Sequence, residues 1–554
     1  MRWMFLLLVF VHCSDKAGVK VGPKSAKQPI PLTFFYLTEL KGTVEPCGCN
    51  SDPLGDIART IQTIDQTRSE SKEVHFIDGG SSLFPEPSIN PQRKSQELLK
   101  ANLVNDLYQN HLKPLAHGLG PLDLSGGMEL LKSPRLVQNL VPNFKLPIDS
   151  PKIIDHHGAK IGLFGLSSPQ SFKDFQLSEP IKTAKRQVAN LKAKGVDTVL
   201  LMAHMPFEEA KTLARSVVGI DFIFVGQGSP DIPGDAWPSA REIGDTWLIQ
   251  PASKGQILSR LDLYIPSPTQ NFSDAIGAGR ATSDVAKLKE NIAEQNAEIQ
   301  KFKADSSSDP NFIAAKEKQL AEMQTRLEKL SKNPLLIPKS GNYFTLDQIK
   351  ISKSLDCNKD IVAKKQAFDK ASGKANVAAA QSTPIKKPAK GESSFIGIEE
   401  CSYCHQEAVD FWNNTKHHLA WETLEEAGKQ FDYECIGCHV TGWNKPGGSN
   451  MSKNETLRDV QCEVCHGPGS IHAEASGPEK KSSIILSPKE TRCIQCHNEE
   501  HSDTFDFKAY LRDVTGKGHG EAFRKTLGEG PSGLELRSAA LKKAGLSVGA
   551  HCPK

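Results

Sequence analysis

A five-residue pattern, Cys-x-x-Cys-His, occurs four times after residue 400 and restricts what the last third of this chain can fold into. Two thiols three residues apart can bond the two vinyl groups of one haem, while the adjacent histidine binds the iron on its proximal side. The pattern therefore predicts four covalently attached c-type haems. The attachment cysteines are Cys401, Cys404, Cys435, Cys438, Cys462, Cys465, Cys493 and Cys496, and the proximal ligands are His405, His439, His466 and His497.

Paired cysteines have two other common uses, structural zinc sites and short-loop disulfides. Neither needs a histidine directly after every second cysteine, so haem is favoured. Eight of the thirteen cysteines are explained in this way. Apart from Cys13, the sequence leaves Cys47, Cys49, Cys357 and Cys552 without an assigned partner.

The same region contains six further histidines but a single methionine, Met451. This composition favours two histidines over histidine and methionine as axial ligands, and it predicts low reduction potentials. In the alternative interpretation, one of the four haem irons has no distal histidine and can bind a small ligand. The candidate distal ligands are His417, His472, His519, His418 and His501, with His551 less certain.

The N-terminus predicts export. Met1 to Met4 include one arginine, an apolar run follows from Phe5 to Val11, and the chain then turns polar after Cys13. Residues 1–12 are read as a signal peptide, with Cys13 as the candidate for lipidation, although His12 departs from the small residue usual at that place. We therefore expect a periplasmic protein or a membrane-anchored lipoprotein.

The length of 554 residues exceeds what one hydrophobic core supports and predicts two domains. A net charge of +3 gives no field that would indicate a nucleic-acid partner. Residues 31–370 alternate short apolar runs with mixed segments, as an α/β domain does. Strands are predicted at residues 74–77, 161–166, 199–202 and 222–225.

Within this domain, residues 283–332 carry apolar side chains at helical spacing, which predicts a helical hairpin that packs on itself or forms a dimer. Residues 336–370 are expected to complete the first domain. Residues 371–392 are rich in Ala, Lys, Pro and Ser and predict a linker. The haem domain is predicted at 393–525, and residues 526–554 are assigned to a C-terminal tail.

Three segments of the second domain resemble the cytochrome c-554 type of multihaem domain. They are residues 411–417, the Cys435 motif with its following Val-Thr-Gly, and residues 461–472. The resemblance implies a mostly helical, haem-packed tetrahaem electron carrier. It also implies that His417 and His472 are distal ligands, and it matches His519 more weakly.

The first domain resembles the metallophosphoesterase and 5'-nucleotidase family, which implies an α/β sandwich with the hairpin as an insertion. The matching segments are residues 55–59, 76–80, 162–167, 203–205, 219–221 and 226–228. That family binds two metal ions, and here most of its ligand positions differ. Glu39 and Lys41 replace the first pair, Ser81 the bridging aspartate, residues 120–122 the Asn-His pair and Gln227 the last histidine, so that only His204 is retained. A lysine at a cation site disfavours two-metal hydrolysis.

Glu45-Pro46-Cys47-Gly48-Cys49 is the most distinctive segment of the first domain. Cys47 and Cys49 are read as a redox-active dithiol or as ligands of an ion. The alternative is a local disulfide or two buried thiols.

The sequence as a whole favours an exported electron carrier that works between a redox-protein donor and a redox-protein acceptor. One alternative is a haem oxidoreductase that acts on a small nitrogen or sulfur compound at an open iron. The other is a metal-dependent nucleotidase with a cytochrome appendage. No catalytic residue is assigned.

Overall fold

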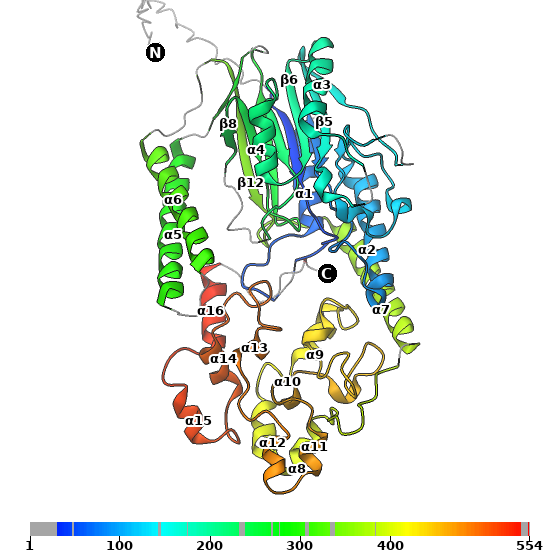
Figure 1. Ribbon diagram of the computed structural model, residues 1–554, viewed down its shortest axis with the longest axis vertical. Helices are drawn as coiled ribbons and strands as arrows, with labels where there is room; N and C mark the ends of the chain where they lie inside the picture. Colours follow the sequence, from blue (N-terminus) through cyan, green and yellow to red (C-terminus); the bar gives the residue numbers. More distant parts are fainter. Residues whose placement is uncertain are drawn as a thin grey trace, which may run out of the picture.

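The computed structural model describes residues 30–46, 49–71, 73–141, 146–173, 176–231, 239–267, 270–275, 278–304, 310–332, 338, 340–382, 384–544 and 552. These residues form an α/β domain and a mainly helical domain below it (Figure 1). The candidate residues Cys13, Cys47 and His551 lie outside the described residues. Within the described residues, no helix is both long enough and apolar enough to cross a bilayer.

The α/β domain contains two six-stranded sheets, and all four predicted strands are present. The first sheet has the order β11-β12-β10-β1-β2-β3 and the second β4-β5-β6-β7-β9-β8. The first comprises β1 (Leu32–Leu37), β2 (Val74–Asp78), β3 (Ala116–His117), β10 (Ile257–Tyr264), β11 (Phe272–Asp274) and β12 (Asn342–Lys350). The second comprises β4 (Lys152–His156), β5 (Ala159–Ser167), β6 (Thr198–His204), β7 (Phe222–Val225), β8 (Arg241–Ile243) and β9 (Thr246–Ile249).

The central strands β1, β6 and β7 are buried along their whole length because each sheet is covered on both sides. One apolar cluster joins Phe34 and Tyr36 of β1 to Phe222 and Phe224 of β7 and therefore lies between the sheets. The outer face of the second sheet packs against α3 (Pro180–Ala193) and α4 (Phe207–Ser216). The predicted sandwich is thus confirmed, with helices on both outer faces.

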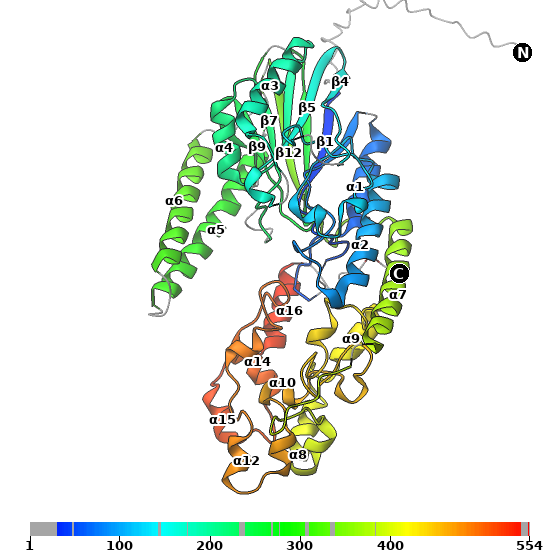
Figure 2. The same ribbon diagram turned by 45° about the vertical axis from the view of Figure 1, so that its right-hand side comes forward.

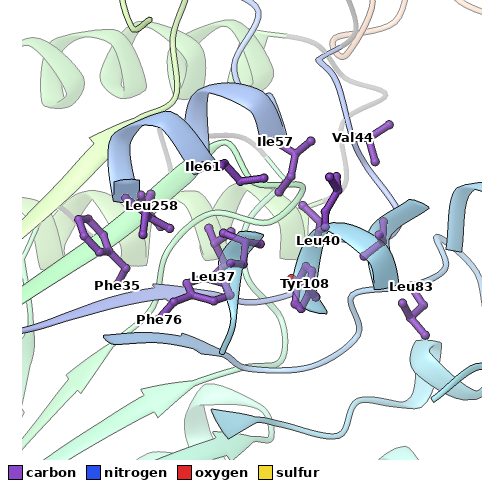
Figure 3. Packing of buried hydrophobic residues seen from close by; sticks show 14 of the residues in the cluster. Phe35, Leu37, Leu40, Val44, Ile57, Ile61, Phe76, Leu83, Tyr108 and Leu258 are labelled. Carbon is purple, nitrogen blue, oxygen red and sulfur yellow. The ribbon is translucent and has the colours of Figure 1, made fainter. Parts of the chain in front are cut away.

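The outer face of the first sheet packs against α1 (Ile57–Glu70), α2 (Lys94–Leu107) and α7 (Lys359–Gln381). Figure 3 shows this cluster, in which Ile57 and Ile61 of α1 lie over Phe35 and Leu258 of the sheet. Strand β12 pairs with β10, so residues 342–350 belong to the first sheet.

The predicted hairpin is formed by α5 (Ala278–Ala304) and α6 (Pro310–Lys332), which stand beside the sandwich in Figures 1 and 2. The two helices pack on each other, with Ile299 buried between them and a 2.6 Å ion pair from Lys303 to Glu317. The hairpin begins five residues earlier than predicted, at Ala278.

The second domain is mainly helical, as predicted, and its helices are short. They are α8 (Ile398–Trp412), α9 (Ala420–Ala427), α10 (Cys462–His466), α11 (Ser470–Glu474), α12 (Pro478–Ser482), α13 (Glu490–Cys493), α14 (Phe507–Val514), α15 (Glu521–Thr526) and α16 (Gly533–Lys543).

Two predicted boundaries differ from the structure. Residues 371–381 are the last turns of α7 rather than part of a linker, and Asn376 and Ala380 are buried there against the second domain. The predicted tail contains α16, which packs on α14. Cys552 packs in the core of the α/β domain and forms a disulfide with Cys357. The composition of residues 371–392 predicted a flexible linker. Alanine and lysine are also good helix formers, however, and they suit a helix that is buried on one side.

Candidate functional site

A cavity of about 2070 Å³ occupies the second domain and reaches the lower edge of the α/β domain. Its lining includes all eight attachment cysteines and all four proximal histidines that the sequence predicts. Pockets for a single drug-sized ligand measure about 300–1000 Å³. The volume and the thiol and imidazole lining therefore fit several haem groups.

The packing of the second domain also indicates that the cavity holds large groups. Its apolar cluster is small and joins Trp421, Tyr433, Ile436, Val440 and Met451 to Ala380 of α7. Bulky groups inside the cavity would supply the buried surface that so few side chains cannot. Met451 is buried in the cluster and does not line the cavity, which disfavours it as an iron ligand.

The motifs occupy the ends of short elements. The first lies in α8, whose backbone leaves helical geometry at His405, and the third forms the whole of α10. The thiols of the first and third motifs meet at Cys401 and Cys462, and those of the second and fourth meet at Cys438 and Cys496. The four attachment points therefore form two adjacent pairs.

Two pairs of imidazole rings face each other across this cavity. The ring centroids of His405 and His472 are 6.2 Å apart and the ring planes differ by 21°. The corresponding values for His417 and His497 are 6.1 Å and 36°. In each pair a predicted proximal histidine thus faces a predicted distal candidate.

Backbone contacts orient several of these rings. The Nδ1 atoms of His439, His466 and His472 lie 2.5, 2.6 and 2.6 Å from the carbonyl oxygens of Ala420, Ile485 and Lys480. A carbonyl can only accept, so Nδ1 carries the proton and Nε2 keeps its lone pair for a metal. Each of the three rings is therefore held in the tautomer that a haem ligand requires.

The remaining distal candidates lie in different surroundings. His519 lines the cavity, and burial, with a smaller contribution from His466, lowers its pKa. His501 also lines the cavity. The His418 ring packs edge-on against Trp412, with the ring centroids 4.6 Å apart, and His418 does not line the cavity.

Sequence reasoning missed Glu463, the second residue of the third motif. Its carboxylate is 2% exposed and accepts hydrogen bonds from the amides of Ile396, Gly397 and Gly469 at 2.7 to 3.0 Å. It joins the start of α8, which carries the first motif, to the loop before His472. Burial raises the pKa of Glu463, and the three amides oppose that shift. The sequence signal that could have identified Glu463 was the presence of an acidic residue inside a haem motif.

The region matching the phosphoesterase metal site contains a compact hydrogen-bond network. Ser81 Oγ lies 3.3 Å from His204 Nε2, and Nδ1 of the same histidine lies 3.0 Å from the carbonyl oxygen of Gly79. Gly120 packs so closely that a Cβ there would collide with Ser81 Oγ and lie 2.8 Å from His204 Cε1. Asp123 fixes the loop by accepting hydrogen bonds from the amides of Ser81, Ser82 and Gly120.

Glu39 and Lys41 are likewise engaged by the protein itself. Glu39 accepts a 2.9 Å hydrogen bond from the amide of Ser229, and Lys41 forms a 3.0 Å ion pair with Asp231. Glu39, Lys41 and Ser81 all have positive φ, a costly conformation for residues other than glycine. Gln227 accepts a hydrogen bond from Ser171. In the described part of the chain, no group of three or more acidic, histidine or cysteine side chains could hold a metal ion, so these residues do not fit a two-metal centre.

Glu45 and Cys49 lie where the two domains meet. Glu45 forms a 3.2 Å ion pair with Lys429 of the second domain, and Cys49 lines the haem cavity. The carbonyl oxygen of Cys49 accepts a 2.5 Å hydrogen bond from Arg537 of α16, and Ser51 N donates to Asp503 at 2.9 Å. The structure therefore brings Cys49, together with Lys41 and Asp231 at the edge of the vacated phosphoesterase site, into the lining of the cavity that holds the predicted haem-attachment residues.

Comparison with known proteins supports both halves. A family model described as cytochrome c554 and c-prime matches residues 400–467. Cytochrome c-554 of Nitrosomonas europaea is 34% identical over 137 residues, which is 19% of this chain and 58% of that protein. A 5'-nucleotidase of Diplobatis ommata is 23% identical over 320 residues, covering 49% of this chain and 54% of that protein. The solved 5'-nucleotidase precursor of Thermus thermophilus covers 44% of this chain and 53% of that structure at 19% identity, with a TM-score of 0.36.

The chain therefore combines a C-terminal domain similar to cytochrome c554 with an N-terminal α/β domain similar to 5'-nucleotidases. It spans between one half and two thirds of the length of these two curated relatives. The two resemblances noted from motifs are confirmed.

Proposed function

We propose that this protein is an exported tetrahaem cytochrome that carries electrons between redox proteins. The observation that carries the proposal is the convergence of four complete attachment motifs on one cavity. The cytochrome c554 match supports haem-based electron transfer. The N-terminal apolar run supports export to the periplasm or, through Cys13, attachment to a membrane.

We assign His472 as the distal ligand of the His405 haem and His417 as that of the His497 haem. Two metal–imidazole bonds of about 2 Å separate the ligating nitrogens by about 4 Å, and each ring centre lies about 1 Å farther out, which gives centroids about 6 Å apart. The observed separations of 6.2 and 6.1 Å match this arrangement. His519 lines the same cavity as His466 and is the distal ligand that we propose for the His466 haem.

The His439 haem is then the candidate for an open axial position, which supports the second proposed activity, an oxidoreductase acting on a small nitrogen or sulfur compound. A haem with two histidine ligands shuttles electrons, whereas an open iron can bind a small molecule. Binding of carbon monoxide by the reduced protein tests this alternative. One equivalent per chain favours the oxidoreductase, and none favours electron transfer alone.

The primary test is the number of covalent haems per chain after expression in a host that matures c-type cytochromes. We expect four by haemochrome absorbance and intact mass. The double substitution Cys462→Ala and Cys465→Ala provides the control and should remove one. Two or fewer haems in the unmutated chain, or stoichiometric zinc on the cysteine pairs, would contradict the proposal.

A further inference from the structure

The junction between the domains forms a hydrogen-bonded clamp on residues 432–434, which directly precede Cys435 of the second motif. Gln96 of α2 is fully buried, donates to the Asp432 carboxylate at 2.6 Å and accepts from the amide of Tyr433 at 3.0 Å. Asn376 of α7 donates to Gln96 Oε1 at 2.8 Å. Figure 1 shows α2 and α7 descending from the α/β domain toward this region.

The same clamp carries charge. Lys100, one turn after Gln96 on α2, is 4% exposed and forms a 2.8 Å ion pair with Glu434. The Lys100 ammonium holds the pKa of Glu434 below its usual value, so the carboxylate next to Cys435 stays ionised. Lys429 adds a second link through Glu45 and through Asp369, at 3.2 and 2.6 Å.

Polar side chains of α2 contact the residues that precede the second haem motif. Gln96, Asn376 and Lys100 are buried at this junction, whereas the Glu434 side chain is 45% exposed. Breaking the contacts of buried polar side chains leaves them unsatisfied, which is costly, so these contacts hold the two surfaces in one geometry. The geometry that is fixed here is that of the second haem motif, because Glu434 is adjacent to Cys435 in the chain.

We propose that the phosphoesterase-like domain serves as a positioning scaffold for the His439 haem and that the Lys100–Glu434 pair sets the reduction potential of this haem. The inference rests on the proposed attachment of haem at Cys435 and Cys438. A carboxylate near a haem favours the more positive ferric state, and a neighbouring ammonium offsets that effect. Lys100 and Glu434 are thus positioning residues with opposite electrostatic influence on one haem.

The test is a spectroelectrochemical titration of the full-length holoprotein and three variants. Lys100→Met leaves the carboxylate uncompensated and should shift one of the four potentials to a more negative value. Glu434→Gln removes the negative charge and should shift the same potential to a more positive value. Lys94→Met, at an exposed position at the start of α2, is the matched control and should shift none.

Opposite shifts of a single potential support the inference, since mere loosening of the junction would move the potential in the same direction in both variants. Shifts of equal sign, shifts in all four haems or no shift in either variant would overturn it. Gln96→Ala leaves both charges in place and provides a second test of the junction if Lys100→Met fails to fold. It should broaden or shift the signal of the same haem and of no other. A haem count below four would instead contradict the proposed function, and the two failures are therefore distinct.

Discussion

The imidazole rings of His417 and His497 face each other at a centroid distance of 6.1 Å although the second and third haem motifs separate them in the sequence. His417 lies in the turn after α8, and His497 ends the fourth motif. Burial, together with the neighbouring His497, lowers the pKa of His417 to about 4. The ring is therefore neutral near pH 7, as a ligand to iron must be.

The first prediction follows from this pair. His417→Ala should convert one low-spin haem to high spin while all four haems stay covalently attached, because attachment depends on the cysteines. His472→Ala should do the same for the His405 haem. Electron paramagnetic resonance and optical spectra of the purified variants provide the measurement.

His418→Ala is the matched control, since its ring packs on Trp412 outside the cavity lining. It should leave the spin states unchanged. Conversion to high spin in His418→Ala but not in His417→Ala would show that the adjacent histidine is the ligand.

The second prediction concerns Glu463, whose carboxylate accepts three backbone hydrogen bonds. Glu463→Ala leaves buried amides without acceptors and should lower the free energy of unfolding by about 2–5 kcal/mol. It should also raise the high-spin fraction of the His405 haem, because Gly469 lies in the loop that positions His472. Chemical denaturation and the optical spectrum measure the two effects.

Glu474→Ala, an exposed position on the same helix as His472, serves as the control and should change neither quantity. Glu463→Gln keeps one acceptor oxygen and should show an intermediate loss. An unchanged spectrum in Glu463→Ala would show that the His472 loop is held by other contacts.

Much of this architecture is encoded locally and could be predicted. The motif pattern singled out eight cysteines that the structure brings to one cavity, and apolar runs predicted strands such as Phe222–Val225. These signals work because buried strands and haem motifs each require particular residue types at short spacing.

Contacts between distant segments could not be predicted in this way. The disulfide between Cys357 and Cys552 joins residues 195 positions apart, and no local pattern records that separation. The same holds for Lys100 and Glu434, which read as ordinary surface charges until the two domains are placed together. The continuation of α7 through residues 371–381 was missed because composition reports the average character of a segment and not which face is buried.

The third prediction tests that disulfide. Cys552→Ser should lower the free energy of unfolding by about 2–4 kcal/mol, because the cross-link closes a long loop and restricts the unfolded chain. A reductant should destabilise the unmutated protein by a similar amount and leave Cys552→Ser unaffected. Thermal unfolding with and without reductant gives the comparison, with Cys49→Ser as the control for loss of a cysteine outside this disulfide. Equal sensitivity of all three proteins to reductant would contradict the disulfide.

The last prediction concerns the vacated phosphoesterase site. The full-length protein should hydrolyse neither nucleotides nor simple phosphate esters in the presence of manganese or zinc. The reason is the ligand set, since Ser81 and Gly120 stand where the family has an acid and an amide, and Lys41 brings a positive charge to the place of a cation.

His204→Ala should therefore leave the background hydrolysis rate unchanged, and Ser81→Asp alone should not create activity because Lys41 and the close packing of Gly120 remain. Metal-stimulated hydrolysis that His204→Ala abolishes would contradict this prediction. The nucleotidase alternative would then hold, and the scaffold role of the α/β domain would have to coexist with catalysis in the same fold.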